Sequence, residues 1–404
     1  MTERRHRVLL ICSHPVQYAS AVFRLMAGHP KLDMLVVYCS LQGAEAGVDP
    51  EFGIEIKCDS QLMDGVPWVY VPNRSYKPGL KRFFGLVNPG LWKLIRTGHF
   101  DAIAVFTGYM YASFWIAAVA AKLHGKPLLF GTDITTLRPL DEKPWKARLK
   151  PLLAPFLFRM VDVLGVGSNA GKDLMRKLGI PADRIVLTPF VVDNDWWNVQ
   201  AAQVDTAAVR RAWGVPADAI VVLFCAKLQP WKRPLDLLSA IARANVSQVY
   251  VVYAGEGPLR QQVETQAFRL GIADRVRMLG FVEQSQLPAF YTAGDLLVVP
   301  SEQDACPVVV CEAMLCGTPV VLSDEVKGRF ELVEDGSTGF VYPCGDIEAL
   351  TATLRQALGD RERLQRLGEK ARHRMETWSP KENVEAWAGA FEKALRLREA
   401  RTLR

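Results

Sequence analysis

The sequence predicts an α/β protein built from two doubly wound domains, and three observations support this fold class. Short apolar runs rich in Val, Ile and Leu alternate along the chain with helix-length amphipathic stretches, which is the pattern of consecutive β–α–β units. The alternation starts again after residue 200. At about 150 residues per domain, a chain of 404 residues accommodates two domains that each bury a core.

Apolar runs bounded by Gly, Pro or Asp are the expected strands. In the first half they cover residues 7–12, 32–38, 102–106, 127–130, 161–166 and 185–188. In the second half they cover residues 220–225, 249–254, 276–279, 295–299 and 319–322. Residues 189–206 show no clear strand or helix pattern and form the expected linker.

These boundaries predict three parts. We expect an N-terminal Rossmann-like domain over residues 1–195 and a C-terminal Rossmann-like domain over residues 205–377. A last helix over residues 378–404 is expected to pack back on the first domain.

The composition, with 50% hydrophobic and 23% charged residues, is that of an ordinary folded protein and excludes a disordered or fibrous chain. The charge is unevenly spread. Residues 1–190 hold 24 Lys and Arg against 15 Asp and Glu, whereas the rest of the chain holds 25 against 28. A basic first half favours an anionic partner, such as a phosphate, a nucleic acid or a membrane face, and scattered surface cations are the alternative.

The cysteines and the apolar segments bear on the cellular setting. The 8 cysteines show no Cys-x-x-Cys pair, so we expect free thiols and a cytoplasmic protein. Charged residues 2–7 precede only a short apolar run, which does not match a signal peptide. Residues 102–121 lack charges over the length of a membrane span, but we predict a buried strand, a turn at 107–109 and a helix over 111–123.

Two lysines follow the strand expected at 220–225. Lys227 and Lys232 lie in the loop that leads into a helix at Leu235. Both lysines can bind one anion such as a diphosphate, beside a helix N-terminus whose free amides favour negative charge.

A second candidate group follows the strand expected at 295–299. Pro307 suits the first turn of a helix that would run to Cys316 before Gly317 ends it. Asp304 then lies in the loop before this helix and Glu312 lies within it. A nucleotide-sugar, with hydroxyls at both ends and a diphosphate in the middle, matches this arrangement. A capping Asp and a surface Glu are the alternative.

Five ordered elements together resemble the family 4 retaining glycosyltransferases of the GT-B fold, also called glycosyl transferases group 1. They are Lys227 with Lys232, and residues 255–259, 279–282, 300–319 and 336–341. Asp304 and Glu312 match the Glu-x7-Glu element of that family, with Asp for the first Glu. The resemblance covers the second half closely and the first half loosely. It implies two Rossmann-like domains facing each other across a cleft, an acceptor-side domain over residues 1–195 and a nucleotide-sugar donor domain over residues 205–377.

The resemblance also implies a function and a role for each matching residue. The chain would move a sugar from a nucleotide diphosphate sugar, a UDP-sugar being favoured, to an acceptor hydroxyl. Lys227, where the family usually has Arg, and Lys232 would hold the diphosphate and neutralise the leaving nucleotide. Asp304 would bind the transferred sugar and Glu312 the ribose, so Lys227, Lys232 and Asp304 are the expected catalytic residues. The backbone that would approach the sugar and phosphates belongs to Cys306, Pro307 and Val308.

The first domain conforms less closely to the family. The run Ser13-His14-Pro15-Val16-Gln17-Tyr18 resembles a His-Pro-(Ile/Val)-Gln-Tyr variant found in some bacterial members. That resemblance implies that His14 and Gln17 lie at the mouth of the cleft, and a loop or cap role for His14 is the alternative. Asp133 is expected to contact the acceptor or the sugar, or else to cap a helix.

The sequence motifs that could indicate a cofactor site are weaker than the donor motifs. Residues 165–170 satisfy the dinucleotide fingerprint Gly-x-Gly-x-x-Ala, but they follow several strands instead of the first one, and no acidic residue closes the next strand. The six histidines lack metal-ligand spacing. We therefore predict no cofactor, neither NAD nor a metal, because the two lysines would neutralise the diphosphate.

No residue is an obvious nucleophile, so retention is expected to proceed by attack on the face from which the nucleotide leaves. Residues 76–84 and 143–159 mix basic and aromatic side chains, which predicts contact with an anionic membrane surface and a lipid-linked or cell-surface glycan precursor as acceptor. A solvated basic face is the alternative. Two other functions stay open: a nucleotide-sugar epimerase or hydrolase of the same fold, and a catalytically silent nucleotide-sugar binding partner.

Overall fold

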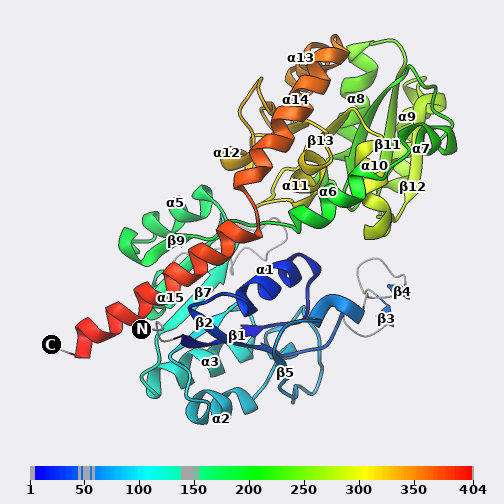
Figure 1. The fold of residues 1–404 in the computed structure, drawn as a ribbon. Helices are drawn as coiled ribbons and strands as arrows, with labels where there is room; N and C mark the ends of the chain where they lie inside the picture. The colour runs from blue at the N-terminus through cyan, green and yellow to red at the C-terminus, as the bar shows by residue number, and fades with distance from the viewer. Residues whose placement is uncertain are drawn as a thin grey trace. The chain divides into compact units, whose positions relative to one another are not determined.

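The computed structural model describes residues 5–43, 47–48, 55–56, 60–137, 150 and 154–402. The chain divides into two compact units (Figure 1). Unit 1 comprises Met1–Phe190 with Pro380–Arg404, and unit 2 comprises Val191–Ser379. Each unit has its own parallel sheet and its own buried apolar core, which confirms the predicted fold class.

Unit 1 contains a seven-stranded sheet in the order β5-β2-β1-β6-β7-β8-β9. Its strands are β1 (His6–Cys12), β2 (Leu32–Tyr38), β5 (Trp68–Tyr70), β6 (Ala102–Val105), β7 (Leu128–Thr132), β8 (Val163–Val166) and β9 (Ile185–Leu187). Strand β5 was not predicted because its three residues are all exposed, so it lacks the apolar pattern of a buried strand. The short strands β3 (Gly47–Val48) and β4 (Glu55–Ile56) pair with each other.

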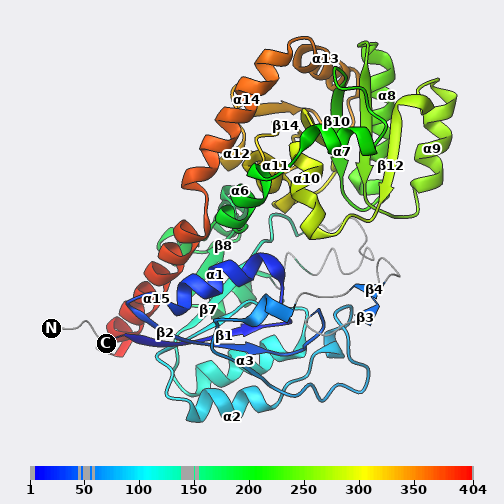
Figure 2. The ribbon, with the colours of Figure 1, turned by 45° about the vertical axis from the view of Figure 1, so that its right-hand side comes forward.

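Helices cover both faces of this sheet. Helix α1 (Gln17–Ala27) and the last helix α15 (Pro380–Thr402) pack together on one face, and α15 contacts β6, β7, β8 and β9. Figures 1 and 2 show α2 (Gly90–Thr97) and α3 (Ala112–Leu123) on the opposite face, while α5 (Asn169–Lys177) lies beside β8 and β9. Short 3-10 turns are η1 (Ser60–Met63), η2 (Phe83–Gly85) and η3 (Ala182–Arg184).

The packing of α15 on the sheet explains why residue 165, in the dinucleotide-like motif, is a glycine. The buried Trp387 ring lies against Phe106, with ring centroids 4.8 Å apart. A Cβ at Gly165 would come within 2.5 Å of the Trp387 ring, so only glycine fits there. The Asn383 side-chain amide also donates a 2.6 Å hydrogen bond to the Pro189 carbonyl. Gly165 therefore allows α15 to pack closely on strand β8.

Unit 2 contains a six-stranded parallel sheet in the order β12-β11-β10-β13-β14-β15. Its strands are β10 (Ile220–Cys225), β11 (Val249–Ala254), β12 (Val276–Gly280), β13 (Leu296–Val299), β14 (Val320–Ser323) and β15 (Gly339–Tyr342).

Helices α8 (Pro234–Ala244), α9 (Arg260–Arg269) and α13 (Ile347–Leu358) bury apolar side chains against this sheet. Helices α6 (Asn194–Ala202), α10 (Leu287–Thr292) and α11 (Val308–Leu315) pack on one another. The remaining elements are α7 (Thr206–Ala212), α12 (Arg329–Leu332), α14 (Arg361–Arg374), η4 (Pro230–Lys232), η5 (Ala273–Arg275), η6 (Gln284–Gln286) and η7 (Met375–Thr377).

The expected linker contains a helix that the sequence pattern did not reveal. The Asp193 side chain caps α6 by accepting from the Trp196 N–H, and the buried Asn194 donates to the Met375 carbonyl at 2.8 Å. The helix has Trp197 almost fully buried but little overall amphipathic contrast, so no helical stripe marks it in the sequence. The first boundary between the two units along the chain therefore falls between Phe190 and Val191, before α6.

Among the helices of the described residues, none combines the length and apolarity that a membrane crossing needs. The charge-free residues 102–121 contain strand β6 and most of helix α3. Cys12, Cys39, Cys225, Cys311, Cys316 and Cys344 are free thiols.

Candidate functional site

The sheet of unit 2 reverses its winding between β10 and β13. After β10 the chain passes outward to β11 and β12 on one side, and it later returns to lay β13 on the other side of β10. Open parallel sheets bind ligands outside the carboxyl ends of the strands at such a reversal. The loops that leave β10 and β13 carry Lys227, Lys232 and Asp304, so the fold brings these three predicted residues to one edge.

An ion pair joins the two loops. Lys232 Nζ lies 2.5 Å from Asp304 Oδ2, and the two side chains are only 23% and 13% exposed. The Glu302 N–H donates a second bridge, of 2.7 Å, to the Trp231 carbonyl. The predicted phosphate-binding cation and the predicted sugar-binding carboxylate are thus held against each other, and Lys227 lies half-buried in the same loop as Lys232.

The glycine-rich loop after β11 braces the lysine loop through its backbone. A Cβ at Gly255 would lie 2.0 Å from the Ala226 carbonyl oxygen, and one at Gly257 would lie 2.5 Å from that of Leu228. The Leu228 N–H donates to the Glu256 carbonyl at 2.9 Å. Residues 255–257 therefore allow two backbones to approach each other closely, which only glycine permits.

Helix α11 begins one residue later than predicted and ends one residue earlier. Pro307 occupies the N-cap position, Val308 is the first helical residue, and Cys316 is the C-cap ahead of Gly317 at φ 78°. No side chain caps this helix, so the capping alternative for Asp304 is wrong. Cys306, Pro307 and Val308 lie at the helix N-terminus that follows the Asp304 loop, as the sequence order requires.

Glu312 is buried within α11, which makes the surface-residue alternative wrong. Its side chain accepts a 2.8 Å hydrogen bond from the Tyr291 hydroxyl, and the residue is 6% exposed. Burial raises the pKa of Glu312 to about 7, and the bond from Tyr291 offsets part of that rise. The carboxyl group is therefore poised to change charge near neutral pH.

The predicted residues of unit 1 lie after neighbouring strands of its sheet. His14 follows β1, its Nδ1 lies 2.9 Å from Ser13 Oγ, and burial lowers the pKa of its ring, which favours the neutral form. Gln17 is exposed as the first residue of α1, and its N-cap is Val16, so His14 does not cap this helix. Asp133 follows β7, and its charge adds to burial in raising the pKa of Tyr18 to about 12.

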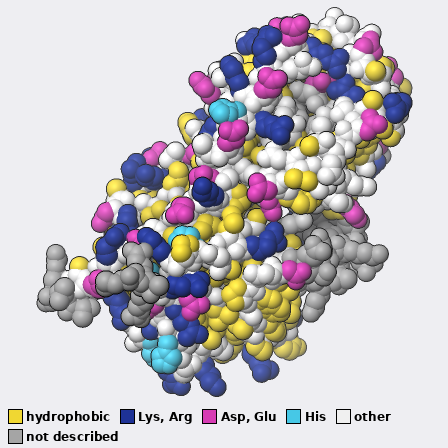
Figure 3. Space-filling view, viewed as in Figure 1, with side chains coloured by type: hydrophobic (Ala, Val, Ile, Leu, Met, Phe, Trp, Pro, Cys, Tyr) yellow, Lys and Arg dark blue, Asp and Glu magenta, His cyan; other side chains and the backbone are white. Residues whose placement is uncertain are grey.

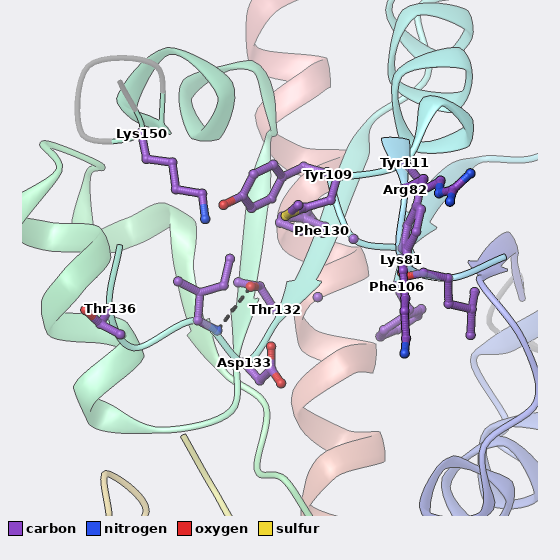
Figure 4. A pocket seen from close by; sticks show the side chains of 15 residues that line it. Lys81, Arg82, Phe106, Tyr109, Tyr111, Phe130, Thr132, Asp133, Thr136 and Lys150 are labelled. Carbon is purple, nitrogen blue, oxygen red and sulfur yellow. Dashed lines mark hydrogen bonds between the residues drawn. The ribbon is translucent and has the colours of Figure 1, made fainter. Parts of the chain in front are cut away.

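A pocket of about 450 Å³ opens at the carboxyl ends of β6 and β7, and it was not anticipated from the sequence (Figure 4). Asp133 lines it, whereas His14 and Gln17 are not among its lining residues. Lys81 and Arg82, from the basic stretch 76–84, lie on one side and Lys150 on the other. Residues 143–149 and 151–153 of the second basic stretch, 143–159, fall outside the described residues. Among the described residues, no group of three or more His, Cys, Asp and Glu side chains has a metal-binding arrangement.

The raised pKa of Glu312 predicts a pH-dependent stability. The carboxyl stays protonated in the folded chain up to about pH 7 but ionises above 4.5 when unfolded, so its stabilising contribution is lost as pH rises through 7. In denaturant titrations, wild type should lose stability between about pH 5 and 7.5 relative to Glu312→Gln. Glu369→Gln, an exposed change on α14, should track wild type. Parallel curves for wild type and Glu312→Gln would contradict the assignment.

Comparison with known proteins agrees with this geometry. Residues 1–191 match the model of the glycosyl transferase 4-like domain, and residues 205–374 match that of glycosyl transferases group 1. A D-inositol 3-phosphate glycosyltransferase of Geodermatophilus obscurus is 36% identical over 208 residues, which are 49% of this chain and 45% of that protein. An alpha-D-kanosaminyltransferase of Streptomyces kanamyceticus is 27% identical over 52% of this chain and 54% of its own length. The matches thus span about half the length of these curated relatives.

Solved structures extend the likeness over the whole chain. The Anabaena protein HepE, crystallised with UDP and glucose, matches with a TM-score of 0.69 at 20% identity, over 95% of this chain and 99% of its own. At that identity the likeness concerns the fold, which is GT-B. The two domain matches, in this order and over two doubly wound units, show that the chain belongs to the family 4 glycosyltransferases, the glycosyl transferases group 1, of the GT-B fold.

Proposed function

We propose that this chain transfers a sugar from a nucleotide diphosphate sugar, with a UDP-sugar favoured, to an acceptor hydroxyl, with retention of the anomeric configuration. The observation that supports this best is the Lys232–Asp304 pair, which puts a cation and a carboxylate of the family's donor motif in contact at the winding reversal of unit 2. Family membership and the UDP bound to HepE favour a nucleoside diphosphate there. Unit 2 would bind the donor and unit 1 the acceptor.

In this proposal the chemistry is mainly electrostatic. Lys227 and Lys232 would neutralise the charge that develops on the diphosphate as it leaves, and the free amides at the start of α11 would add to that field. Asp304 would then exchange its bond with Lys232 for hydroxyls of the sugar, and Glu312 would receive the ribose. The departing phosphate oxygen would accept the proton of the attacking hydroxyl, so no protein nucleophile and no metal would be required.

Lys232→Ala should lower turnover by about 10²-fold or more, because one preorganised charge on the leaving group is lost. The assay is release of UDP from a UDP-sugar in the presence of acceptor, with EDTA and with magnesium compared. Lys370→Ala, an exposed lysine of the same unit, should keep wild-type turnover. A folded Lys232→Ala with normal turnover would refute the assignment, and product formed equally without acceptor would indicate a hydrolase or epimerase instead.

We further propose that the acceptor is a lipid-linked or cell-surface glycan precursor met at the inner face of a membrane. Figure 3 shows hydrophobic side chains gathered on the surface around β5, bordered by Lys and Arg. Aromatic residues that are exposed in this region and the following loop include Trp68, Tyr70, Tyr76, Phe83 and Phe84, with Tyr76 94% and Phe84 70% exposed. Such a mixture of aromatic and basic side chains suits an anionic membrane surface.

Sedimentation with liposomes measures that contact. Wild type should pellet with anionic but not with neutral vesicles, and added salt should release it, because each basic side chain near the surface contributes about 1 kcal/mol that salt screens. The double change Tyr76→Ala with Phe84→Ala should reduce the bound fraction, whereas Phe268→Ala, an exposed aromatic of unit 2, should not. Equal recovery in the supernatant with both kinds of vesicle would remove the membrane claim.

A further inference from the structure

Among the described residues, the side chain of Glu312 has one hydrogen-bond donor, the hydroxyl of Tyr291. Tyr291 lies on α10 and is fully buried, and its hydroxyl oxygen is 2.8 Å from Glu312 Oε2 on α11. The other carboxyl oxygen, Oε1, accepts from no described residue. The protein thus fixes one oxygen of this carboxyl group and leaves the other to accept a hydrogen bond from a ligand.

Packing around the ring of Tyr291 keeps its hydroxyl in place. Helices α6, α10 and α11 lie together in unit 2 (Figures 1 and 2). Trp197 of α6, itself 1% exposed, packs on the Tyr291 ring with centroids 5.8 Å apart. The Tyr291 carbonyl accepts a 2.8 Å hydrogen bond from the hydroxyl of Thr318, in the segment that follows α11. Moving the hydroxyl away from Glu312 would therefore require the core around α10 to open.

The same hydroxyl connects to the end of strand β10. Burial raises the pKa of the Cys225 thiol to about 12, and the hydrogen bond with Tyr291 and the charge of Lys232 offset part of that rise. A tyrosine hydroxyl that donates to Glu312 can also accept from this neutral thiol. Cys225 is the last residue of β10, two positions before Lys227. The bonded side chains thus run from the base of the lysine loop to Glu312.

Stability alone does not explain a glutamate at position 312. The other residues of α11 from Val310 to Leu315 are apolar and at most 1% exposed. A carboxyl group in this run costs free energy of burial that an apolar side chain of similar size would avoid. Burial raises the pKa of Glu312 and the bond from Tyr291 lowers it, so that bond favours the ionised form, which is the better acceptor for hydroxyls.

We propose that Tyr291 is a positioning residue of the donor site: its hydroxyl orients the Glu312 carboxylate so that Oε1 accepts from the ribose hydroxyls of the nucleotide. This inference rests on the proposed function, which assigns Glu312 to the ribose, and adds the residue that prepares this carboxylate for binding. A carboxylate that is oriented before the nucleotide arrives loses less conformational entropy when it binds.

Calorimetric titration of the full chain with two nucleotides tests this inference. The probes are UDP and 2′,3′-dideoxy-UDP, which has the same base and diphosphate but lacks both ribose hydroxyls. The readout is the ratio of their Kd values. Wild type should prefer UDP by about 10-fold or more, the value of a hydrogen bond to a charged group, and Tyr291→Phe should reduce this preference by about 3-fold or more. A purely structural role would weaken both nucleotides alike and leave the ratio unchanged.

Two further variants serve as controls. Tyr253→Phe is matched, because Tyr253 is a fully buried tyrosine of the same unit whose hydroxyl donates to the Pro234 carbonyl at 2.9 Å, and it should keep the wild-type ratio. Glu312→Met removes the carboxyl group with little change in volume. In that background Tyr291 has no carboxylate to orient, so adding Tyr291→Phe should not change the ratio. This second comparison tests the inference even if the single Tyr291→Phe variant does not fold.

The inference is overturned if folded Tyr291→Phe keeps the wild-type ratio, or if Tyr291→Phe lowers the ratio in the Glu312→Met background as much as it does in wild type. Such a result leaves the transferase proposal standing, provided that wild type prefers UDP. Equal binding of both nucleotides by wild type would contradict the ribose role of Glu312 together with this inference. Failure of wild type to bind either nucleotide would remove the proposed UDP-sugar donor itself.

Discussion

The contact between Lys232 and Asp304 is the interaction on which the proposed donor site depends. It joins the loops that leave β10 and β13, the two neighbouring strands between which the winding of the sheet reverses. Both side chains are largely removed from solvent, so neither charge is well hydrated and each needs the other until a ligand takes over. A diphosphate for the lysine and sugar hydroxyls for the aspartate would replace the pair with two new sets of contacts. The ion pair thus keeps both groups at the place where they would act.

The surrounding backbone makes that position rigid. Gly255 and Gly257 let the loop after β11 lie directly on the lysine loop, and the Glu302 N–H ties the aspartate loop to it from the other side. In unit 1, side-chain hydrogen bonds to the backbone have a similar effect. Those of Asn73, Asn88 and Tyr111 hold the loop that carries Lys81 and Arg82. In each unit, cations at the carboxyl ends of parallel strands are placed by a scaffold of hydrogen bonds and close glycine contacts.

The sequence predicted the parts of this structure that rest on local patterns. Buried strands such as β2, β10 and β11 have the predicted bounds because continuous apolar runs mark them. Strand β5 and helix α6 were missed because the first is exposed and the second has no amphipathic stripe. The donor residues could be named from motif order, yet the Lys232–Asp304 contact could not, because it joins residues 72 positions apart. The pocket in unit 1 depends on loops from separate segments, so only Asp133 and the basic stretch hinted at it.

Titration of UDP into wild type and Asp304→Asn tests the central claim most directly. If Lys232 serves the diphosphate, and Asp304 pairs with that lysine until the donor binds and then contacts the sugar, removing the carboxylate charge frees the lysine. UDP should then bind the variant at least as tightly as wild type, while transfer from the UDP-sugar falls because the sugar contact is lost. A folded Asp304→Asn whose affinity for UDP drops about 10-fold or more, equivalent to about 1.4 kcal/mol, would contradict this division of roles.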